Sequence, residues 1–249
     1  MSWRVKKRIQ ITFFLFLIFL VFIFFIYSLK KEKPSCFDGI QNQGEIGIDC
    51  GGPCIPCRFF ELKEPEIETI KKFDFRGVLD ILVVILNKNY DYGLDNFTLK
   101  IKIIKDDIVL LEQEKISFLN PGQRKYIIFE GLPLKYLNYK VDVEIKRSNW
   151  IKPKISSDNI ELDFQNVNIQ KEGNFYILSG TILNKRNISI NNIKILGMLL
   201  SEYDEILNIG VINLGNLGPL KNKEFKIFLK IQPTPYSKFK LVPDVNLFY

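Results

Sequence analysis

The residues from Ile11 to Leu29 form an uninterrupted apolar run, ITFFLFLIFLVFIFFIYSL, that contains no charged residue, proline or glycine. An α-helix rises about 1.5 Å per residue, so a helix of these nineteen residues would cross a hydrocarbon core of about 30 Å. Lipid offers the backbone no hydrogen-bond partner, so such a segment must be helical. We therefore expect a transmembrane helix over residues 11–29, a cytoplasmic tail over residues 1–10, and the lipid bilayer as a partner.

A cleaved signal peptide is the alternative interpretation of this run. The apolar region of a signal peptide is ordinarily about 7–15 residues long and is followed by small residues at the cleavage site. Here the run is longer, and Tyr27-Ser-Leu-Lys-Lys31 follows without an Ala-x-Ala-like site. The sequence therefore favours an uncleaved signal anchor. Basic residues flank both of its ends in similar number, so charge alone does not set its orientation.

The formal net charge of +7 is concentrated beside the apolar run. Residues 1–33 carry +6, which leaves about +1 for the remaining 216 residues. The flanking basic residues suit anionic headgroups, and no concentrated basic face remains to neutralise phosphates, so we expect no nucleic-acid partner. The chain has no histidine, and we find no nucleotide-binding or nucleophile motif. The sequence therefore predicts a protein that is not an enzyme, with no catalytic residue.

All four cysteines lie within 22 residues, at Cys36, Cys50, Cys54 and Cys57. An even number of clustered cysteines in a segment too short to build a core suggests two disulfides, which require an oxidising compartment. A bridge between the two cysteines of the CxxC pair would close a very small loop, so we favour pairing each of them with Cys36 or Cys50. The rival hypotheses are a four-cysteine zinc site, weakened by the long first spacing, and a redox-active CxxC, weakened by the absence of a thioredoxin-like unit.

Oxygen-bearing side chains recur within the same segment, at Asp38, Asn42, Glu45 and Asp49. Such side chains on a glycine-rich loop can form a calcium site, although the spacing is not that of an EF-hand. The alternative is that Asp and Asn cap turns while Gly supplies positive φ. Calcium at these four residues is the single metal hypothesis that the sequence offers beside zinc, and we otherwise expect no cofactor.

The pattern C-x-D-G-x-x-N-x-x-E-x-x-x-D-C-G-G-x-C, from Cys36 to Cys54, resembles a short cysteine motif of exported and surface proteins of bacteria and archaea. That motif often stands beside Ig-like or other adhesive modules. The resemblance covers a small part of the chain, within the cysteine-rich segment that we assign to residues 34–58. It implies an exported location and no particular activity.

Behind a charged connector, assigned to residues 58–72, the pattern changes to the period-two alternation of β-strands. Phe97–Ile104 alternates apolar and polar residues as a half-buried strand does, and Asn120-Pro-Gly122 indicates a turn. Two acidic clusters, Asp106-Asp107 and Glu202–Glu205, are most simply hairpin turns. Little of this region shows a helical period, so the fold class is predicted to be all-β.

The second half of the body repeats the first. Ile85-Leu-Asn-Lys88 recurs as Ile182-Leu-Asn-Lys185. Further matches follow in the same order: Asn96–Leu99 with Asn192–Ile195, Leu119–Pro121 with Leu217–Pro219, Tyr126–Phe129 with Phe225–Phe228, and Tyr136 and Tyr139 with Tyr236 and Phe239. We therefore predict two homologous domains, residues 73–150 and 160–249. Their length and short strands indicate two tandem Ig-like β-sandwiches behind the helix and the cysteine segment.

The second domain, from Phe175–Asn184 through Leu217–Leu220 to Phe225–Phe228, also resembles the FxLYD-type Ig-like modules of prokaryotic envelope proteins. It departs from them in having Met198-Leu-Leu-Ser-Glu-Tyr203 where Leu-Tyr-Asp is usual. The resemblance implies an accessory, non-catalytic role.

The predicted function is that of a single-pass, non-enzymatic envelope or surface protein. Its N-terminus would lie in the cytoplasm, and its tandem Ig-like domains would serve binding, adhesion or envelope scaffolding outside it. The expected partners are other envelope proteins or surface polymers. The alternative is an accessory subunit of a membrane secretion or pilus-type complex. An enzyme with an unfamiliar site is a third hypothesis, which the missing histidine disfavours.

Overall fold

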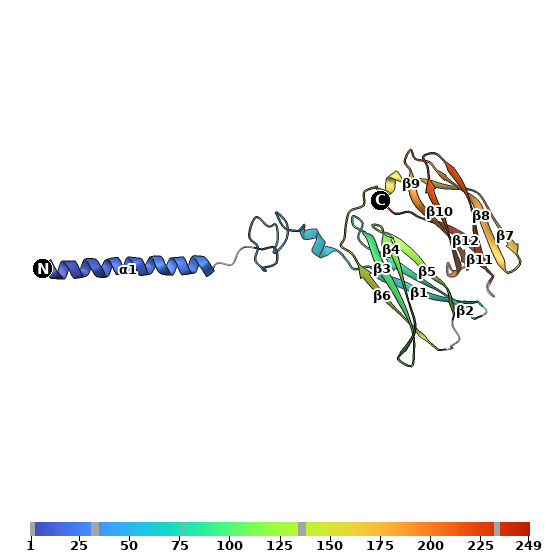
Figure 1. Cartoon of the computed structure of the whole chain (residues 1–249). Coiled ribbons are helices and arrows are strands. Elements are labelled where there is room, and N and C mark those ends of the chain that lie inside the picture. Colours follow the sequence, from blue (N-terminus) through green and yellow to red (C-terminus); the bar gives the residue numbers. More distant parts are fainter. Residues whose placement is uncertain (1–2, 31–34, 76, 134–137, 232–234) are drawn as a thin grey trace. The chain divides into compact units, whose positions relative to one another are not determined.

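The computed structural model describes residues 3–30, 35–75, 77–133, 138–231 and 235–249 (Figure 1). Contacts divide the chain into two units, Met1–Leu62 and Lys63–Tyr249. The first unit contains helix α1 (Trp3–Lys30) and the cysteine segment, which ends in a short 3₁₀ helix, η1 (Cys57–Glu61). The second unit is built from β-strands.

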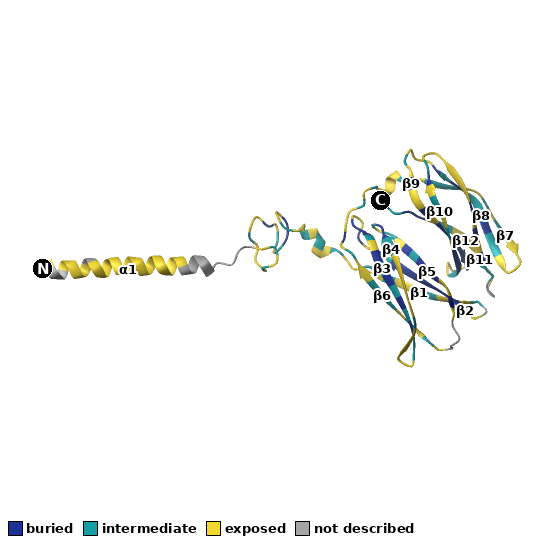
Figure 2. Ribbon diagram, viewed as in Figure 1, coloured by how far each residue is buried: buried dark blue, intermediate teal, exposed yellow. Residues whose placement is uncertain are grey.

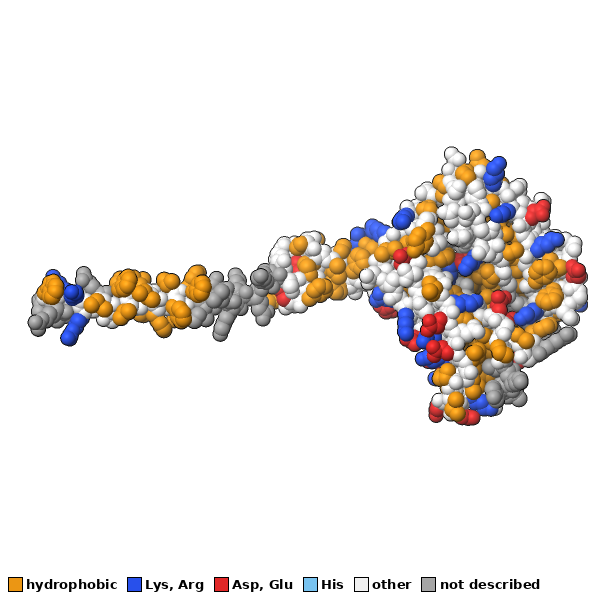
Figure 3. Space-filling model, viewed as in Figure 1, with side chains coloured by type: hydrophobic (Ala, Val, Ile, Leu, Met, Phe, Trp, Pro, Cys, Tyr) orange, Lys and Arg blue, Asp and Glu red, His pale blue; other side chains and the backbone are white. Residues whose placement is uncertain are grey.

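Helix α1 contains the stretch Lys6–Phe25, which is long and apolar enough to cross a membrane. Every side chain described within that stretch is exposed, and hydrophobic side chains cover it (Figures 2 and 3). The helix begins at Trp3, so most of the residues predicted as a separate tail continue it, and Lys7 Nζ lies 4.9 Å from the centre of the Trp3 ring. A signal sequence near the N-terminus can also meet this criterion of length and hydropathy, so the helix by itself does not separate the two interpretations.

Strands β1 to β6 form the first sandwich. They span Glu66–Phe75, Val78–Leu86, Leu94–Lys105, Ile108–Leu119, Arg124–Pro133 and Lys140–Arg147. Two antiparallel three-stranded sheets result, ordered β1-β2-β5 and β4-β3-β6. In β3, Leu99, Ile101 and Ile103 are fully buried, whereas the alternate lysines face away from the core. The predicted alternation therefore sets which face of this sheet forms the core.

Strands β7 to β12 form the second sandwich, behind the short 3₁₀ helix η2 (Ser157–Asn159). They span Leu162–Glu172, Phe175–Asn184, Ile190–Leu200, Ile206–Leu217, Asn222–Lys230 and Lys238–Asp244. Their sheets are ordered β11-β8-β7 and β10-β9-β12. Leu178 of β8, Ile195 of β9 and Ile227 of β11 belong to one buried cluster between these sheets. The prediction of two tandem β-sandwiches is confirmed.

Each strand of the second sandwich pairs as its counterpart six strands earlier does, which supports the sequence repeat. The repeated asparagine also has the same role in both halves. Asn87 Nδ2 donates to the carbonyls of Tyr92 and Asn120 at 2.8 and 2.9 Å, and Asn87 Oδ1 accepts the N–H of Asn89. In the second sandwich, Asn184 makes the equivalent three bonds around the loop that follows β8. The repeated tyrosine at residue 136 lies outside the described residues.

Replacing Asn184 with leucine should lower the free energy of unfolding by about 2–4 kcal/mol, because two carbonyls and one N–H would lose their buried partner. Asn184 is 0% exposed. Denaturant unfolding of the variant measures the loss. Asn191→Leu, at an exposed position of β9, is the matched control and should change stability little. Equal stabilities of the two variants would contradict the structural role of the repeated asparagine.

The charged connector assigned to residues 58–72 is a wrong prediction. Residues 57–61 form η1, and β1 begins at Glu66 rather than at residue 73. Among the strands that the structure describes, β1 pairs with β2 alone, so it is an edge strand, where charged side chains can face solvent without disturbing a core. The predicted turns are confirmed, and Asp106 and Asp107 take positive φ values of 50° and 62° between β3 and β4.

The two sandwiches pack against each other through a second buried cluster. The first sandwich contributes Phe73, Leu82, Val84 and Ile128, and the second contributes Leu196, Met198, Leu200 and Ile209. Sheet β1-β2-β5 therefore has one face in its own core and one against sheet β10-β9-β12 (Figure 2). The strands β2 and β9 are buried on both faces as a result, and the body behaves as one unit.

Candidate functional site

The four cysteines form two disulfides, Cys36–Cys54 and Cys50–Cys57. The preference for pairing Cys36 and Cys50 each with one cysteine of the CxxC pair is confirmed. No free cysteine remains among the described residues. Zinc binds thiolates, so this oxidised arrangement offers no thiolate ligand to the alternative zinc site. Cys54 and Cys57 are also not bonded to each other, as the two cysteines of an oxidised redox-active CxxC pair would be.

The oxygen-bearing side chains of the cysteine segment hold its turns together. Asp49 Oδ1 accepts the backbone N–H groups of Asp38 and Gly39 at 3.0 and 3.1 Å. Glu45 Oε2 accepts those of Asn42 and Asp49, both at 3.2 Å. These contacts match the turn-capping alternative. Calcium at the four residues stays a prediction.

Asp38 and Asn42 complete this arrangement. Asp38 accepts the backbone N–H groups of Ser35 and Ile40 and the side-chain amide of Asn42, each at 3.0 Å. The N–H of Ser35 and the Asn42 amide hold the pKa of Asp38 below its usual value. Asn42 Oδ1 is buried without a hydrogen-bond partner among the described residues.

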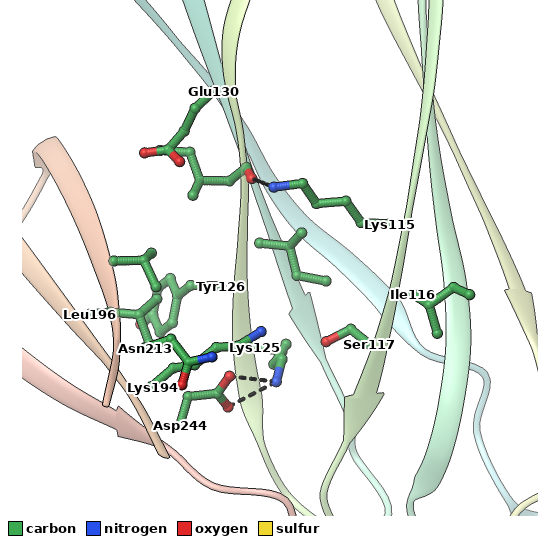
Figure 4. A pocket seen from close by; sticks show the side chains of 13 residues that line it. Lys115, Ile116, Ser117, Lys125, Tyr126, Glu130, Lys194, Leu196, Asn213 and Asp244 are labelled. Carbon is green, nitrogen blue, oxygen red and sulfur yellow. Dashed lines mark hydrogen bonds and ion pairs between the residues drawn. The ribbon is translucent and has the colours of Figure 1, made fainter. Parts of the chain in front are cut away.

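A cavity of about 270 Å³ lies where the two sandwiches meet (Figure 4). Strands β4 and β5 of the first sandwich and strands β9, β10 and β12 of the second supply its walls. Its polar and charged lining residues are Lys115, Ser117, Lys125, Tyr126, Glu130, Lys194, Asn213 and Asp244. We call this cavity the lysine pocket.

A buried ion pair forms one wall of the lysine pocket. Lys125 Nζ lies 2.8 and 2.7 Å from the two carboxylate oxygens of Asp244, and the side chains are 3% and 7% exposed. Gln123 Nε2 donates to the same carboxylate at 3.0 Å. Burial lowers the pKa of Lys125 to about 8, against the opposing effect of Asp244, and the charge of Lys194 lowers it further. The pair joins β5 of the first sandwich to β12 of the second.

Two further ammonium groups come to the pocket from different sandwiches. Lys115 Nζ donates to the carbonyl of Ile128 at 2.6 Å. Burial lowers the pKa of Lys115, Glu130 opposes that shift, and Lys194 adds to it, so the charges of Lys115 and Lys194 act on each other. Lys194 itself is exposed. With Ser117 beside them, these lysines can receive a small acidic group.

The sequence did not single out the lysine pocket. Lys115 and Lys194 are 79 positions apart and belong to different domains, and a lysine in an alternating strand is ordinarily solvent-facing. One local signal existed. Lys125 lies directly before the apolar run of β5, at a position of the strand that the alternation assigns to the buried face.

Stability should depend on pH through Lys125. Its pKa of about 8 in the folded chain lies below about 10.4, the value for an unfolded chain, so the unfolded state binds more protons between these values. The contribution of Lys125 to stability should therefore be smallest below about pH 8 and should rise as the pH increases towards about 10.4.

Comparing denaturant unfolding of the wild type and Lys125→Met across that range isolates this effect. The difference in unfolding free energy should shift in favour of the wild type as the pH rises. Lys171→Met, at an exposed position of β7, should give a difference that does not change with pH. A flat difference for Lys125→Met would contradict the lowered pKa.

Comparisons with known proteins do not place the chain in a family. No protein-family model matches it. The chain is 25% identical to Protein TIC 214 of Nasturtium officinale over 121 residues, which cover 48% of this chain and 6% of that protein. So short a share of the relative at this identity shows no common family, and the function has to be inferred from the residues and their geometry.

Proposed function

We propose that this chain is a membrane-anchored, non-enzymatic protein that presents a pair of β-sandwiches outside the cytoplasm for binding, adhesion or scaffolding. The observation that carries the proposal is the sequence of elements in the first unit, where two disulfides follow directly behind an apolar helix. Disulfides persist in oxidising compartments and are rare in the cytoplasm. The short N-terminal side of α1 then stays in the cytoplasm, and everything from the cysteine segment onward lies outside.

The packing of the two sandwiches supports a presenting role. The shared cluster around Leu82 and Met198, together with the Lys125–Asp244 pair, fixes one sandwich against the other. Partners of tandem β-modules bind at sheet edges and end loops, which a fixed pair holds at constant spacing. Other envelope proteins and surface polymers are partners that such a body suits.

The experiment that tests the proposal maps free thiols by mass spectrometry in intact membranes, with and without external protease. We expect all four cysteines to resist alkylation until a reductant is added. External protease should remove peptides of residues 63–249 and spare those of the N-terminal ten residues. Free thiols in freshly isolated membranes, or a body that only lysis exposes to protease, would contradict the proposed orientation.

Within this function, the lysine pocket is where we expect the body to receive an acidic group of its partner. The charge of Lys194 helps to lower the pKa of Lys115, and an anion bound in the pocket would offset that repulsion. An oligomer of glucuronic acid is a suitable probe for an acidic surface polymer, and an oligomer of glucose is its neutral match.

Titration calorimetry on the full chain in detergent should detect binding of the acidic oligomer alone. Lys194→Glu should weaken this binding at least about tenfold, since it replaces attraction by repulsion at the pocket. Lys171→Glu makes the same charge change away from the pocket and should leave binding nearly unchanged. Equal losses in both variants would assign the binding to overall charge and would contradict the pocket as the site.

A further inference from the structure

The cysteine segment, taken here with the whole of η1 as Ser35–Leu62, has an inverted distribution of polar and apolar side chains. Its carboxylates accept backbone N–H groups, and Glu45 is only 7% exposed. Its large apolar side chains are on the outside, with Phe37 84% and Ile46 78% exposed. The other large apolar side chains exposed in this segment are Ile40, Ile48, Ile55 and Phe60. Figure 3 shows hydrophobic side chains on the surface of this part of the chain.

The fold of the segment does not depend on these outward side chains. Two disulfides and the carboxylate-capped turns hold its backbone, so the isoleucines and phenylalanines are not needed for a core. Exposed apolar side chains concentrated in one small segment indicate a contact surface, because water penalises leaving them uncovered.

The position of the segment in the chain identifies what covers it. Helix α1 ends at Lys30, and four residues separate that end from Ser35. A chain extends by at most about 3.6 Å per residue, so Ser35 remains within about 20 Å of the end of the helix. If α1 crosses a bilayer, the segment has to lie at the membrane surface, beside the basic residues Lys30, Lys31 and Lys33 that suit anionic headgroups.

We propose that the cysteine segment is a lipid-contacting collar, which inserts Phe37, Ile40, Ile46 and Ile48 into the interfacial region of the outer leaflet around the end of α1. The proposal rests on the membrane anchoring proposed above. Apolar side chains on a compact module gain from entering the boundary between headgroups and acyl chains. The carboxylates suit this location, because Glu45 is buried and the half-buried Asp38 and Asp49 are bonded to backbone N–H groups, which leaves less negative charge to repel anionic lipid.

Fluorescence of the full chain in vesicles of phosphatidylcholine and phosphatidylglycerol tests the proposal. A Trp3→Phe background removes the tryptophan at the start of α1, and Trp150, which is 6% exposed, gives a constant baseline. Phe37→Trp places a probe on the collar. Tyr203→Trp, at a residue that is 81% exposed in the turn between β9 and β10, is the matched water-exposed control.

Lipids brominated on the acyl chains should quench Phe37→Trp at least about twofold more than Tyr203→Trp, because bromine quenches only tryptophan that reaches the chain region. Ile48→Trp repeats the measurement from a second position. Intact disulfides, checked by mass without reductant, show that each variant has folded. Equal quenching of the collar and control probes in these variants would overturn the proposal.

Flotation of the vesicles separates this proposal from the anchor itself. Protein that floats with the vesicles while its collar probes stay unquenched refutes the lipid contact but still supports membrane anchoring by α1. Protein that fails to float after reconstitution refutes both. Protein that floats with quenched collar probes supports both.

Discussion

Replacing Asp244 with alanine should lower the free energy of unfolding of the β-sandwich body by about 3–5 kcal/mol, because the ammonium group of Lys125 would stay buried without its counter-charge. Both side chains are almost fully buried, and Gln123 would lose its acceptor at the same time. Denaturant unfolding of the full chain in detergent, in a Trp3→Phe background and followed by fluorescence of Trp150, measures the loss.

An exposed ion pair provides the control for this prediction. Asp204 pairs with Lys238 at 2.6 Å, but the two side chains are 70% and 47% exposed. Asp204→Ala should therefore cost less than about 1 kcal/mol. The double variant Lys125→Met with Asp244→Leu should recover most of the loss, since apolar residues of similar size often replace a buried pair without penalty. A loss from Asp244→Ala no larger than that from Asp204→Ala would contradict the importance of burial.

Replacing Met198 with aspartate should uncouple the two sandwiches and cost about 4 kcal/mol or more, because an unpaired charge would enter the shared cluster. Met198 is 1% exposed and belongs to the same cluster as Leu82 and Val84. We expect the wild-type body to unfold in one transition, because the sandwiches share this cluster, and the variant to unfold in two. Differential scanning calorimetry distinguishes these outcomes.

A variant in the first sandwich tests whether the uncoupling comes from the shared cluster rather than from damage to the second sandwich alone. Leu82→Ala, in the first sandwich, should cost about 2–5 kcal/mol and should also weaken the coupling of the two transitions. Val109→Asp, on a side chain of β4 that is 50% exposed, should leave a single transition. Two separate transitions in the wild type would show that the shared cluster does not couple the sandwiches.

The sequence carried more information about this contact than the period-two alternation revealed. Phe97–Ile104 alternates strictly, and β3 indeed has one buried face. In β2, the residues from Leu79 to Leu86 are apolar on both faces of the strand, apart from Asp80. Strand β9 has a similar run from Ile195 to Leu200. Continuous apolar strands are typical of burial on both faces, so these two runs indicated that a second layer covers each strand.

Asp80 is the one charged residue within the apolar run of β2, and it is buried nonetheless. It is 6% exposed and accepts the N–H of Gly131 at 2.8 Å and a hydrogen bond from Lys230 of the second sandwich. A carboxylate can enter an apolar contact when it is paired in this way. The sequence gives no sign of that pairing, because the partners are 150 positions apart.

The candidate sites differ in how far local sequence determines them. The disulfides involve cysteines at most 18 positions apart, so loop size alone could exclude one pairing. The lysine pocket depends on contacts such as Lys125–Asp244, which join residues 119 positions apart. Those contacts follow from the packing of one sandwich on the other, and no motif in either strand encodes it.

The two sandwiches meet through non-equivalent sheets, since β1-β2-β5 of one repeat lies against β10-β9-β12 of the other. A contact between two different surfaces can be repeated by each added copy, so further repeats could in principle extend the pair into a column. We expect the outer face of sheet β4-β3-β6 to disfavour such growth at the first sandwich. Lys100 is paired there with Glu112 and Glu114, each at 2.7 Å, and a docking neighbour would have to strip water from these charges. This surface therefore resembles the polar outer face of a terminal repeat, which ends a stack of repeats by presenting charges to water.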